Sequence, residues 1–248
     1  MTLAKRIIPT ILVRGRQMVK GIAFDAWRTV GLAAQAVRIH QMRGVDELVL
    51  LDIAATREGR GPDLALVREL TDACFMPLAI GGGIRRAKDV VPLMLAGADK
   101  VVLGTIALEQ PGVVMECARR FGSQAIVVAL DVDRTGRAVI RSGTVATDVW
   151  ADEFAEGCEF LGVGELLLTA IANEGKMQGY DLELIGRVSG KTGIPVIAAG
   201  GCGTYKHMFE AIQAGADAVA AGAMFQFSDQ TPRGAAEYLT GKGVEVRL

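Results

Sequence analysis

Cysteine and histidine are scarce in this chain, which has 4 cysteines and 2 histidines among 248 residues. The cysteines lie far apart and form no CxxC pair, so they favour reduced, mostly buried thiols over a disulfide framework or a zinc site. We therefore expect no metal site and no cofactor.

Excess charge and long apolar runs are also missing. The formal net charge is −1, which gives no reason to expect a nucleic-acid partner or an acidic membrane surface. No apolar run reaches the roughly 18 residues that a membrane span needs. The first residues, MTLAKRIIPTILVRGRQ, are too polar for a signal peptide. We expect a cytoplasmic protein that binds neither nucleic acid nor membrane.

What the sequence does contain is an internal repeat. When Met76 is laid on Ile194, MPLAIGGGIRRAKDVVPLMLAGADKVVLGT aligns without a gap with IPVIAAGGCGTYKHMFEAIQAGADAVAAGA. A unit of half the chain is too long for a solenoid, whose units run roughly 20–50 residues. Each unit alternates short apolar runs with helical stretches. The sequence therefore predicts an α/β protein, a single (β/α)8 TIM barrel over residues 1–248, made of half-barrels at about 1–122 and 123–248.

Eight near-continuous apolar runs are typical of parallel strands buried on both faces. We predict strands at Ile7–Val13, Glu47–Ile53, Pro77–Gly81, Lys100–Gly104, Ala125–Asp131, Glu165–Ile171, Pro195–Ala199 and Ala218–Gly222. Amphipathic stretches between them predict helices at Asp63–Cys74, Ala87–Ala96, Gly112–Phe121, Tyr205–Ala214 and Thr231–Thr240. The longest segments expected to be irregular are Arg14–Thr29, Asp133–Ala146 and Ala172–Tyr180. All three follow a strand, at the end where such barrels keep their chemistry.

Glycines follow four of the predicted strands in two repeat-related pairs. Gly81-Gly82-Gly83 and Gly104-Thr105 match Gly200-Gly201-Cys202-Gly203 and Gly222-Ala223. Glycine lets backbone N–H groups turn toward a bound anion, and a following helix N-terminus adds a favourable dipole. The pairs predict two phosphate sites on opposite sides of the barrel, although glycines can also serve only as tight strand-to-helix turns.

Asp131 ends the fifth predicted strand, where barrel enzymes place acids and bases. The repeat pairs it with Leu12, so a site with two carboxylates has been reduced to one. Asp52, at the end of the second strand, is a further candidate, with a structural role as a hydrogen-bond acceptor as its alternative. Lys20 could reach a phosphate or act as an acid, but a loop lysine is more often simply solvated.

The stretches LAKRIIP, DELVLLDI, GGGI, GADKV, FGSQAIVVALD, GELLLT, GYD, IPVIAAGG, AGADAV and GVEVRL together resemble the cyclase subunit of imidazole glycerol phosphate synthase. The resemblance runs from Leu3 to Leu248. It implies a barrel that takes ammonia from a separate glutaminase subunit and joins it to a phosphorylated sugar derivative with a phosphate at each end.

The resemblance also assigns residues to the expected site. It places phosphate contacts on Gly82, Gly104 and Thr105 at one end and on Gly175, Gly201, Gly222 and Ala223 at the other. The family usually has Asn at the position of Gly104 and Ser at that of Ala223. Its two catalytic aspartates map onto Asp131, which is kept, and Leu12, which is not; its loop-one lysine is kept as Lys20. In the sixth loop, Ser-Ile-Asp-Arg-Asp-Gly is replaced by AIANEG, residues 170–175.

At the amino-terminal face the family gates an ammonia channel with a ring of charged residues, here Arg6, Glu47, Lys100 and Glu165. Such a ring could instead only close the barrel bottom, and burying it would be costly without pairing. Asp99 matches a family contact to the glutaminase. No cysteine sits in a strand-turn-helix elbow with a histidine partner, so the ammonia must come from another protein.

The loss of an aspartate at a general acid/base position removes a group worth roughly 10²–10⁴ in rate. We therefore expect a paralogue of the cyclase, similar to the proteins associated with glycosyl amidation in bacterial surface polysaccharide synthesis, working with a sugar-amidating enzyme. The stretches CFMPLAIGGGI and TILVRGRQMVK favour this interpretation. The alternatives are the cyclase subunit of histidine biosynthesis, using Asp131 with a substitute acid, and a non-catalytic ammonia conduit or scaffold. The related isomerase of histidine synthesis shares the repeat but needs both aspartates, and is disfavoured.

Overall fold

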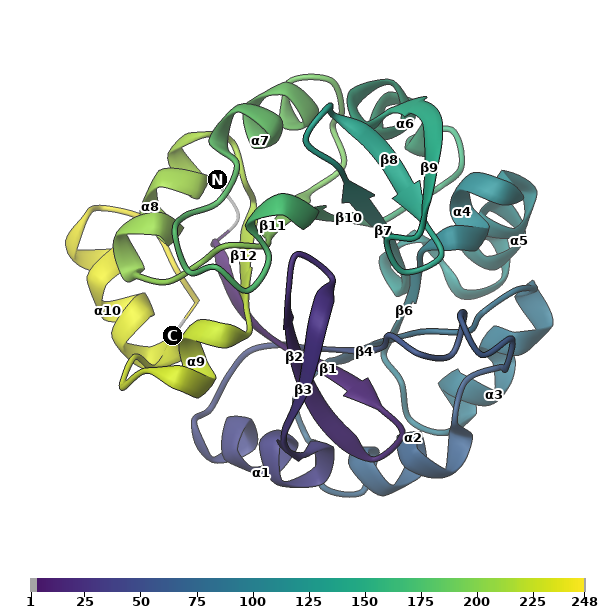
Figure 1. The fold of residues 1–248 in the computed structure, drawn as a ribbon, viewed down its shortest axis with the longest axis horizontal. Coiled ribbons are helices and arrows are strands. Elements are labelled where there is room, and N and C mark those ends of the chain that lie inside the picture. The colour runs from purple at the N-terminus through teal and green to yellow at the C-terminus, as the bar shows by residue number, and fades with distance from the viewer. Residues whose placement is uncertain (1–3, 248) are drawn as a thin grey trace.

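The computed structural model describes residues 4–247 and folds them into a closed parallel barrel surrounded by helices (Figure 1). Residues 1–3 and 248 of the predicted single domain lie outside the described residues. The barrel strands are β1 (Arg6–Arg14), β4 (Leu48–Asp52), β5 (Leu78–Gly81), β6 (Lys100–Leu103), β7 (Ile126–Val132), β10 (Glu165–Ala170), β11 (Val196–Ala199) and β12 (Ala218–Ala221). They follow chain order around the ring, and β12 pairs with β1 to close it. This confirms the predicted (β/α)8 barrel.

The barrel strands lie where the apolar runs predicted them, each beginning and ending within one residue of the expected bounds. Both faces of each strand are covered, which is why the runs are continuous rather than alternating. The outer face packs against the helices in the main core. The inner face forms a second core that fills the barrel, made of Ile8, Val49, Ala79, Val102, Val127, Leu167, Ile197, Ala218 and Ala220.

The helices lie outside the strands and bury one apolar face each. Asp63 and Asp181 cap two of them: Asp63 accepts hydrogen bonds from two N–H groups of the first turn and Asp181 from one. The helices are α1 (Ala33–Met42), α2 (Leu64–Thr71), α3 (Val90–Leu95), α4 (Thr105–Glu109), α5 (Pro111–Phe121), α6 (Ala151–Cys158), α7 (Leu182–Ser189), α8 (Tyr205–Gln213), α9 (Ala223–Phe227) and α10 (Pro232–Gly241). All five predicted helical stretches are confirmed.

Two of the three segments expected to be irregular are β-hairpins instead. The first pairs β2 (Gln17–Ile22) with β3 (Asp25–Leu32), and the second pairs β8 (Arg137–Ile140) with β9 (Val145–Trp150). Their turns place non-glycine residues at positive φ, including Ala23 at 49° and Arg141 at 55°. These turns lack the Asn-Gly or Asp-Gly signal that predicts a hairpin, and β3 is mostly exposed, so no apolar period revealed it. The third segment, Ala172–Tyr180, is irregular as predicted, apart from the end of a short 3-10 turn.

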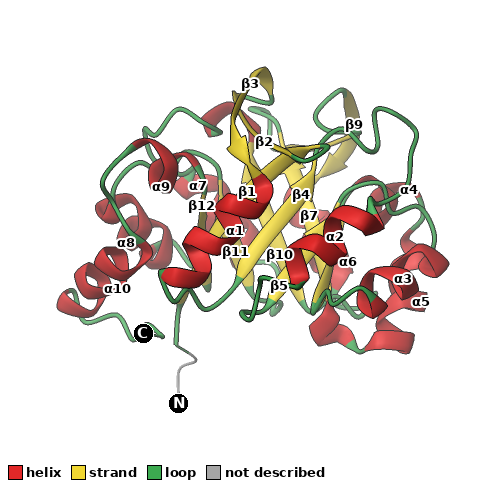
Figure 2. Cartoon of the chain, turned by 90° about the horizontal axis from the view of Figure 1, so that it is seen from below, coloured by secondary structure: helices red, strands yellow, loops and turns green. Residues whose placement is uncertain are grey.

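Both hairpins rise from one end of the barrel (Figure 2). Because β2 follows β1 and β8 follows β7, this end is where the parallel strands finish. We call it the mouth, and the opposite end, where the strands begin, the floor. At the floor, Lys5 bridges Val246 and so ties the two ends of the described chain together. Within residues 4–247, no helix is long and apolar enough to cross a membrane.

Candidate active site

A cavity occupies the mouth, with about 1200 Å³ of space including its opening to solvent. It is lined by every residue predicted for the catalytic and phosphate sites: Lys20, Gly82, Gly104, Thr105, Asp131, Gly175, Gly201, Gly222 and Ala223. These come from six different strand ends and from one hairpin, so the fold brings together what the sequence separates.

Gly82 and Gly201 occupy equivalent turns after β5 and β11. Their φ angles are 116° and 101°, which side-chain-bearing residues rarely adopt. A Cβ at Gly82 would lie 2.4 Å from the carbonyl oxygen of Asp52, and one at Gly201 would lie 2.1 Å from that of Gly179. Both glycines are therefore required by the fold. Both turns line the cavity, so the need for glycine in the fold is compatible with the predicted phosphate sites.

Gly222 makes room for Lys20. A Cβ on this glycine would lie 2.0 Å from the Lys20 Nζ. Lys20 belongs to β2 and is only 3 % exposed, so the interpretation of this residue as a solvated loop lysine is wrong. The hairpin folds it into the cavity instead, and burial lowers its pKa while the nearby Glu174 opposes this. The cation is therefore placed beside the turn that was expected to bind a phosphate.

Gly104 and Thr105 lie where β6 meets α4. A Cβ at Gly104 would meet only the Cβ of Ala129, at 4.0 Å, so packing does not demand a glycine there. The Asn that the family has at this position would fit, and its absence leaves this wall of the cavity less polar. The Thr105 hydroxyl accepts a 2.8 Å hydrogen bond from the Arg141 N–H of the second hairpin. Its oxygen is thus partly engaged within the protein.

Gly175 packs the loop after β10 against the first hairpin. Its φ is 74°, and a Cβ would lie 2.1 Å from the Gly21 carbonyl oxygen. The preceding residue, Glu174, accepts a 2.9 Å hydrogen bond from the Ala23 N–H through its own carbonyl. Glu174 itself is one of the residues that line the cavity. Sequence reasoning listed this residue only as part of an altered loop; its place after a strand and before a required glycine was the available signal.

Asp131 lies on the barrel wall beside Thr169, its neighbour on β10. Burial raises the pKa of the Asp131 carboxyl to about 7; the Thr169 hydroxyl lowers the pKa and the Glu174 charge raises it further. A carboxyl with this pKa exists in both protonation states near neutral pH. It can therefore accept or donate a proton, as an acid/base group must.

Neither Leu12 nor Asp52 adds a free carboxylate to the mouth. Leu12 lines the cavity at the end of β1 and contributes no titratable group. Asp52 accepts hydrogen bonds from the N–H groups of Ala54 and Ala55, at 3.1 and 3.2 Å, and pairs with Arg60 at 2.7 Å. With its carboxylate committed in this way, the structural role that was the alternative for Asp52 is supported.

Two aromatic residues of the first hairpin also line the cavity, and sequence reasoning missed them. Phe24 and Trp27 lie over the mouth from the turn and from β3. Gly143 of the second hairpin approaches Phe24, since a Cβ there would lie 2.7 Å from its ring. The two hairpins therefore meet over the cavity and add apolar surface to it.

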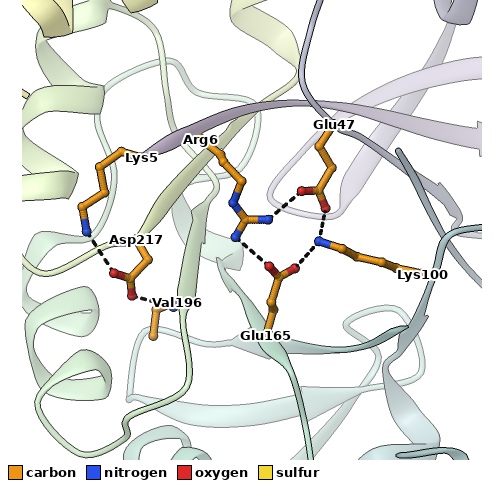
Figure 3. Close-up of polar contacts among 7 residues, drawn as sticks. All are labelled: Lys5, Arg6, Glu47, Lys100, Glu165, Val196 and Asp217. Carbon is orange, nitrogen blue, oxygen red and sulfur yellow. Dashed lines mark hydrogen bonds and ion pairs between the residues drawn. The ribbon is translucent and has the colours of Figure 1, made fainter. Parts of the chain in front are cut away.

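The four charged residues predicted at the floor form a closed ring (Figure 3). Arg6 pairs with Glu47 at 2.6 Å and with Glu165 at 2.7 Å. Lys100 pairs with the same two carboxylates at 2.8 Å each. The Glu47 side chain is only 4 % exposed, and burial at this cost requires the full pairing that the ring supplies. Burial would lower the pKa of Arg6, but both carboxylates more than compensate and raise it.

Asp99 lies outside this ring, and its carboxylate binds the backbone at the start of a barrel strand. Its carboxylate accepts a 2.9 Å hydrogen bond from the Leu78 N–H at the start of β5. Asp217, its partner in the repeat, does the same for Val196 at 3.1 Å and also pairs with Lys5 (Figure 3). Asp99 is exposed, so the rest of its surface remains accessible for a partner.

Exposed apolar side chains also lie at the floor end of the molecule. The four most exposed large hydrophobic residues are Met42, Phe75, Leu95 and Phe160, at 80–86 % exposure. Each closes or follows a helix and precedes a barrel strand, namely β4, β5, β6 or β10. They therefore share the end of the molecule that carries the charged ring.

The cysteines carry no chemistry in this arrangement. All four are free thiols, and three of them (Cys117, Cys158 and Cys202) are buried, as predicted. Burial raises the pKa of Cys158 to about 12, so it does not form the reactive thiolate near neutral pH. In the part of the chain that the structure describes, no group of three or more His, Cys, Asp and Glu residues is placed to hold a metal ion.

A parallel barrel with an acid and glycine turns around a cavity at its strand ends defines the class of (β/α)8 proteins that bind ligands at the mouth. Residues 6–231 match the family described as histidine biosynthesis protein. The chain is 41 % identical to imidazole glycerol phosphate synthase subunit HisF of Dictyoglomus thermophilum over 250 residues, and 42 % identical to that of Exiguobacterium sibiricum over 248. Both comparisons cover 99 % of this chain and at least 99 % of the relative. The chain therefore belongs to the HisF-type histidine biosynthesis family.

Proposed function

We propose that this chain is the ammonia-using cyclase subunit of a two-protein synthase of the imidazole glycerol phosphate synthase type, acting in the cytoplasm. The observation that carries the proposal is the pairing of a charged ring at the floor with an acid/base site at the mouth of the same barrel. Between them lies the apolar inner core, which neutral ammonia crosses more easily than ammonium does. The names of the relatives support the same function.

The partner in this proposal is a glutaminase docked on the floor. Phe75, Leu95, Phe160 and Met42 would offer it exposed apolar side chains at the end that carries the ring, and Asp99 lies at the same end. Apolar anchors next to charged groups are typical of specific protein interfaces. Ammonia released there would enter through the ring formed by Arg6 and the three residues paired with it.

The substrate in this proposal is a phosphorylated sugar derivative with a phosphate at each end. Gly82, Gly104 and Thr105 would hold one phosphate, and Gly175, Gly201, Gly222 and Ala223 the other. Lys20 would add a buried positive charge at the second site. The repeat places the two sites in corresponding positions of two half-barrels, and we infer that the single domain arose from such a duplication.

A second candidate is amidation of a sugar in surface polysaccharide synthesis, with the ammonia passed to a separate sugar-amidating enzyme. One observation favours it: Leu12 stands in the cavity wall where the repeat predicts a second carboxylate. The less polar wall at Gly104 agrees with this candidate. In this case the barrel would remain a conduit or scaffold, although it would no longer catalyse the cyclisation reaction.

Turnover with ammonium salts separates the two candidates, because it removes the need for a glutaminase. We expect the purified chain to convert the imidazole glycerol phosphate synthase substrate at an ordinary enzyme rate of roughly 1–10³ s⁻¹. The matched variant is Leu12→Asp, which restores the second strand-end carboxylate. A wild type that is inactive while Leu12→Asp is active would reject the cyclase assignment and favour amidation.

A further inference from the structure

Three carboxyl groups line the described part of the mouth cavity, and only one of them has no role so far. Asp131 has the properties of an acid/base group, and Asp52 is held by two N–H groups and Arg60. The third is Glu174, in the loop after β10. This side chain lies in the wall of the same cavity that has lost a carboxylate at Leu12.

The backbone fixes Glu174 where it is. Its N–H donates to the Ile171 carbonyl at 3.2 Å, and its own carbonyl accepts the Ala23 N–H at 2.9 Å. The next residue, Gly175, lies so close to the hairpin that a Cβ would come within 2.1 Å of the Gly21 carbonyl oxygen. The loop is therefore fastened to the hairpin that carries Lys20. Because of this contact, Glu174 from the loop after β10 and Lys20 from β2 lie in the wall of the same cavity.

The titratable groups near Glu174 come from three other parts of the chain. Lys20 on β2 attracts its carboxylate, and Asp131 on β7 and Tyr180 before α7 are its other titratable neighbours. Burial raises the pKa of the Glu174 carboxyl, and the Lys20 charge opposes this rise. The Glu174 charge in turn raises the pKa of the Asp131 carboxyl, so the protonation of Asp131 depends on that of Glu174.

We propose that Glu174 is the second proton-transferring carboxyl of the mouth and works with Asp131 in place of the carboxylate that Leu12 has removed. This inference rests on the proposed function. When ammonia adds to a carbonyl carbon, the new C–N bond leaves nitrogen with a positive charge, and this nitrogen must lose a proton. The carbonyl oxygen must gain protons before its C–O bond breaks and it leaves as water. One carboxylate accepts and one carboxylic acid donates, so the pair exchanges roles while the number of protons is conserved.

The test compares Glu174→Gln with the wild type in ammonium-dependent turnover of the imidazole glycerol phosphate synthase substrate. We expect kcat to fall by roughly 10²-fold or more and one limb of its pH profile to disappear. Glu174→Asp should recover part of the rate, and Leu12→Asp should recover it in the Glu174→Gln background. Glu183→Gln, an exposed residue in the first turn of α7, is the matched control and should leave kcat unchanged.

The possible outcomes separate a failure of the Glu174 proposal from a failure of the proposed cyclase function. Wild-type turnover with the same kcat and pH profile in Glu174→Gln would overturn the role of Glu174 and leave the cyclase assignment intact. A change in KM alone would do the same, because it would make Glu174 only a counter-ion for Lys20. A wild type that is inactive, whether or not Leu12→Asp revives it, would overturn both, since Glu174 would then not replace the missing carboxylate.

Discussion

The two ends of this barrel differ in how completely their polar groups are paired. At the floor, Arg6, Lys100, Glu47 and Glu165 satisfy one another in a ring with four contacts between 2.6 and 2.8 Å. At the mouth, burial shifts the pKa values of Lys20, Asp131 and Glu174, raising those of the two acids and lowering that of the lysine. Full pairing is typical of a structural role, whereas buried acids and bases whose charged forms are disfavoured by burial are candidates for chemistry.

The comparison also shows which end has changed relative to the pattern of the repeat. The floor keeps a charge at every expected position. The mouth has Leu12 where the repeat predicts an acid, and Gly104 leaves open space in its wall. The two ends can change separately, because the apolar inner core lies between them.

The largest expected effect is at the mouth. Asp131→Asn keeps the shape of the side chain but removes the proton acceptor, so we expect ammonium-dependent turnover to fall by roughly 10²–10⁴. Steady-state rates at saturating ammonium measure this. Asp148→Asn, on β9 and exposed, is the control and should keep its activity. Unchanged turnover in Asp131→Asn would show that the mouth is not the site of chemistry.

The next effect is at the floor. Lys100→Met leaves Glu47 and Glu165 with Arg6 as their only ring partner, and we expect a loss of about 3 kcal/mol in the free energy of unfolding, since buried pairs that lose one member typically cost 3–5 kcal/mol. Removing a negative charge as well, in Glu47→Gln with Lys100→Met, should recover much of this. Urea unfolding curves measure both changes. Equal stability of the single and double variants would show that the ring is solvated.

The double variant also tests the conduit. With a glutaminase partner present, product formed per glutamate released should fall, while turnover with ammonium salts should remain. The reason is that only glutamine-derived ammonia has to pass the ring. Equal performance with both nitrogen sources would make the ring a structural plug, and the floor would then differ from the mouth only in stability.

Two patterns that can be seen directly in the sequence, the apolar runs and the internal repeat, predicted the barrel well. Continuous apolar runs report burial on both faces, and the repeat fixes the number of strands. The ring residues were named from the resemblance to the cyclase subunit, and Glu47 and Glu165 also occupy the same place in the repeat. The repeat itself pointed to the glycine turns, and the positive φ of Gly82 and Gly201 explains why glycine is needed there.

What could not be predicted depends on contacts between distant segments. The first hairpin turns at Ala23 and Phe24 without a glycine, and the second contains Gly143 but no Asn-Gly or Asp-Gly pair, so neither turn carries the strongest local signal for a hairpin. As long as the first hairpin is not recognised, Lys20 is interpreted as a solvated loop residue and Glu174 as part of an altered loop. The structure buries Lys20 at 3 % exposure and fastens Glu174 to the hairpin, and only this long-range contact shows that both belong to the cavity.

A smaller effect links activity at the mouth to stability. The pKa of Asp131 is raised to about 7, so the folded state holds a proton that the unfolded state has already lost at pH 5 or 6. The wild type therefore loses stability as pH rises from about 4 to about 7. Relative to it, Asp131→Asn should gain about 2 kcal/mol at pH 8 and little at pH 4, allowing for partial exposure. Asp133→Asn is the control of opposite sign: burial would raise the pKa of Asp133, but hydrogen bonds from Thr135 and nearby N–H groups lower it, so its loss should destabilise at pH 8.

The smallest effect separates the two phosphate sites within the mouth. Ala223 is buried at the start of α9, and the matching position on the other side is Thr105, which carries a hydroxyl. Ala223→Ser adds one hydrogen-bond donor beside Gly222 and Lys20, and a single hydrogen bond is worth roughly 0.5–1.5 kcal/mol. We therefore expect inorganic phosphate to bind about 2–10-fold more tightly at this side, as measured by calorimetric titration. Ala223→Gly, which adds no donor, is the control. If serine and glycine bind phosphate equally, no anion sits at Gly222, and Lys20 serves the carboxyl groups rather than a phosphate.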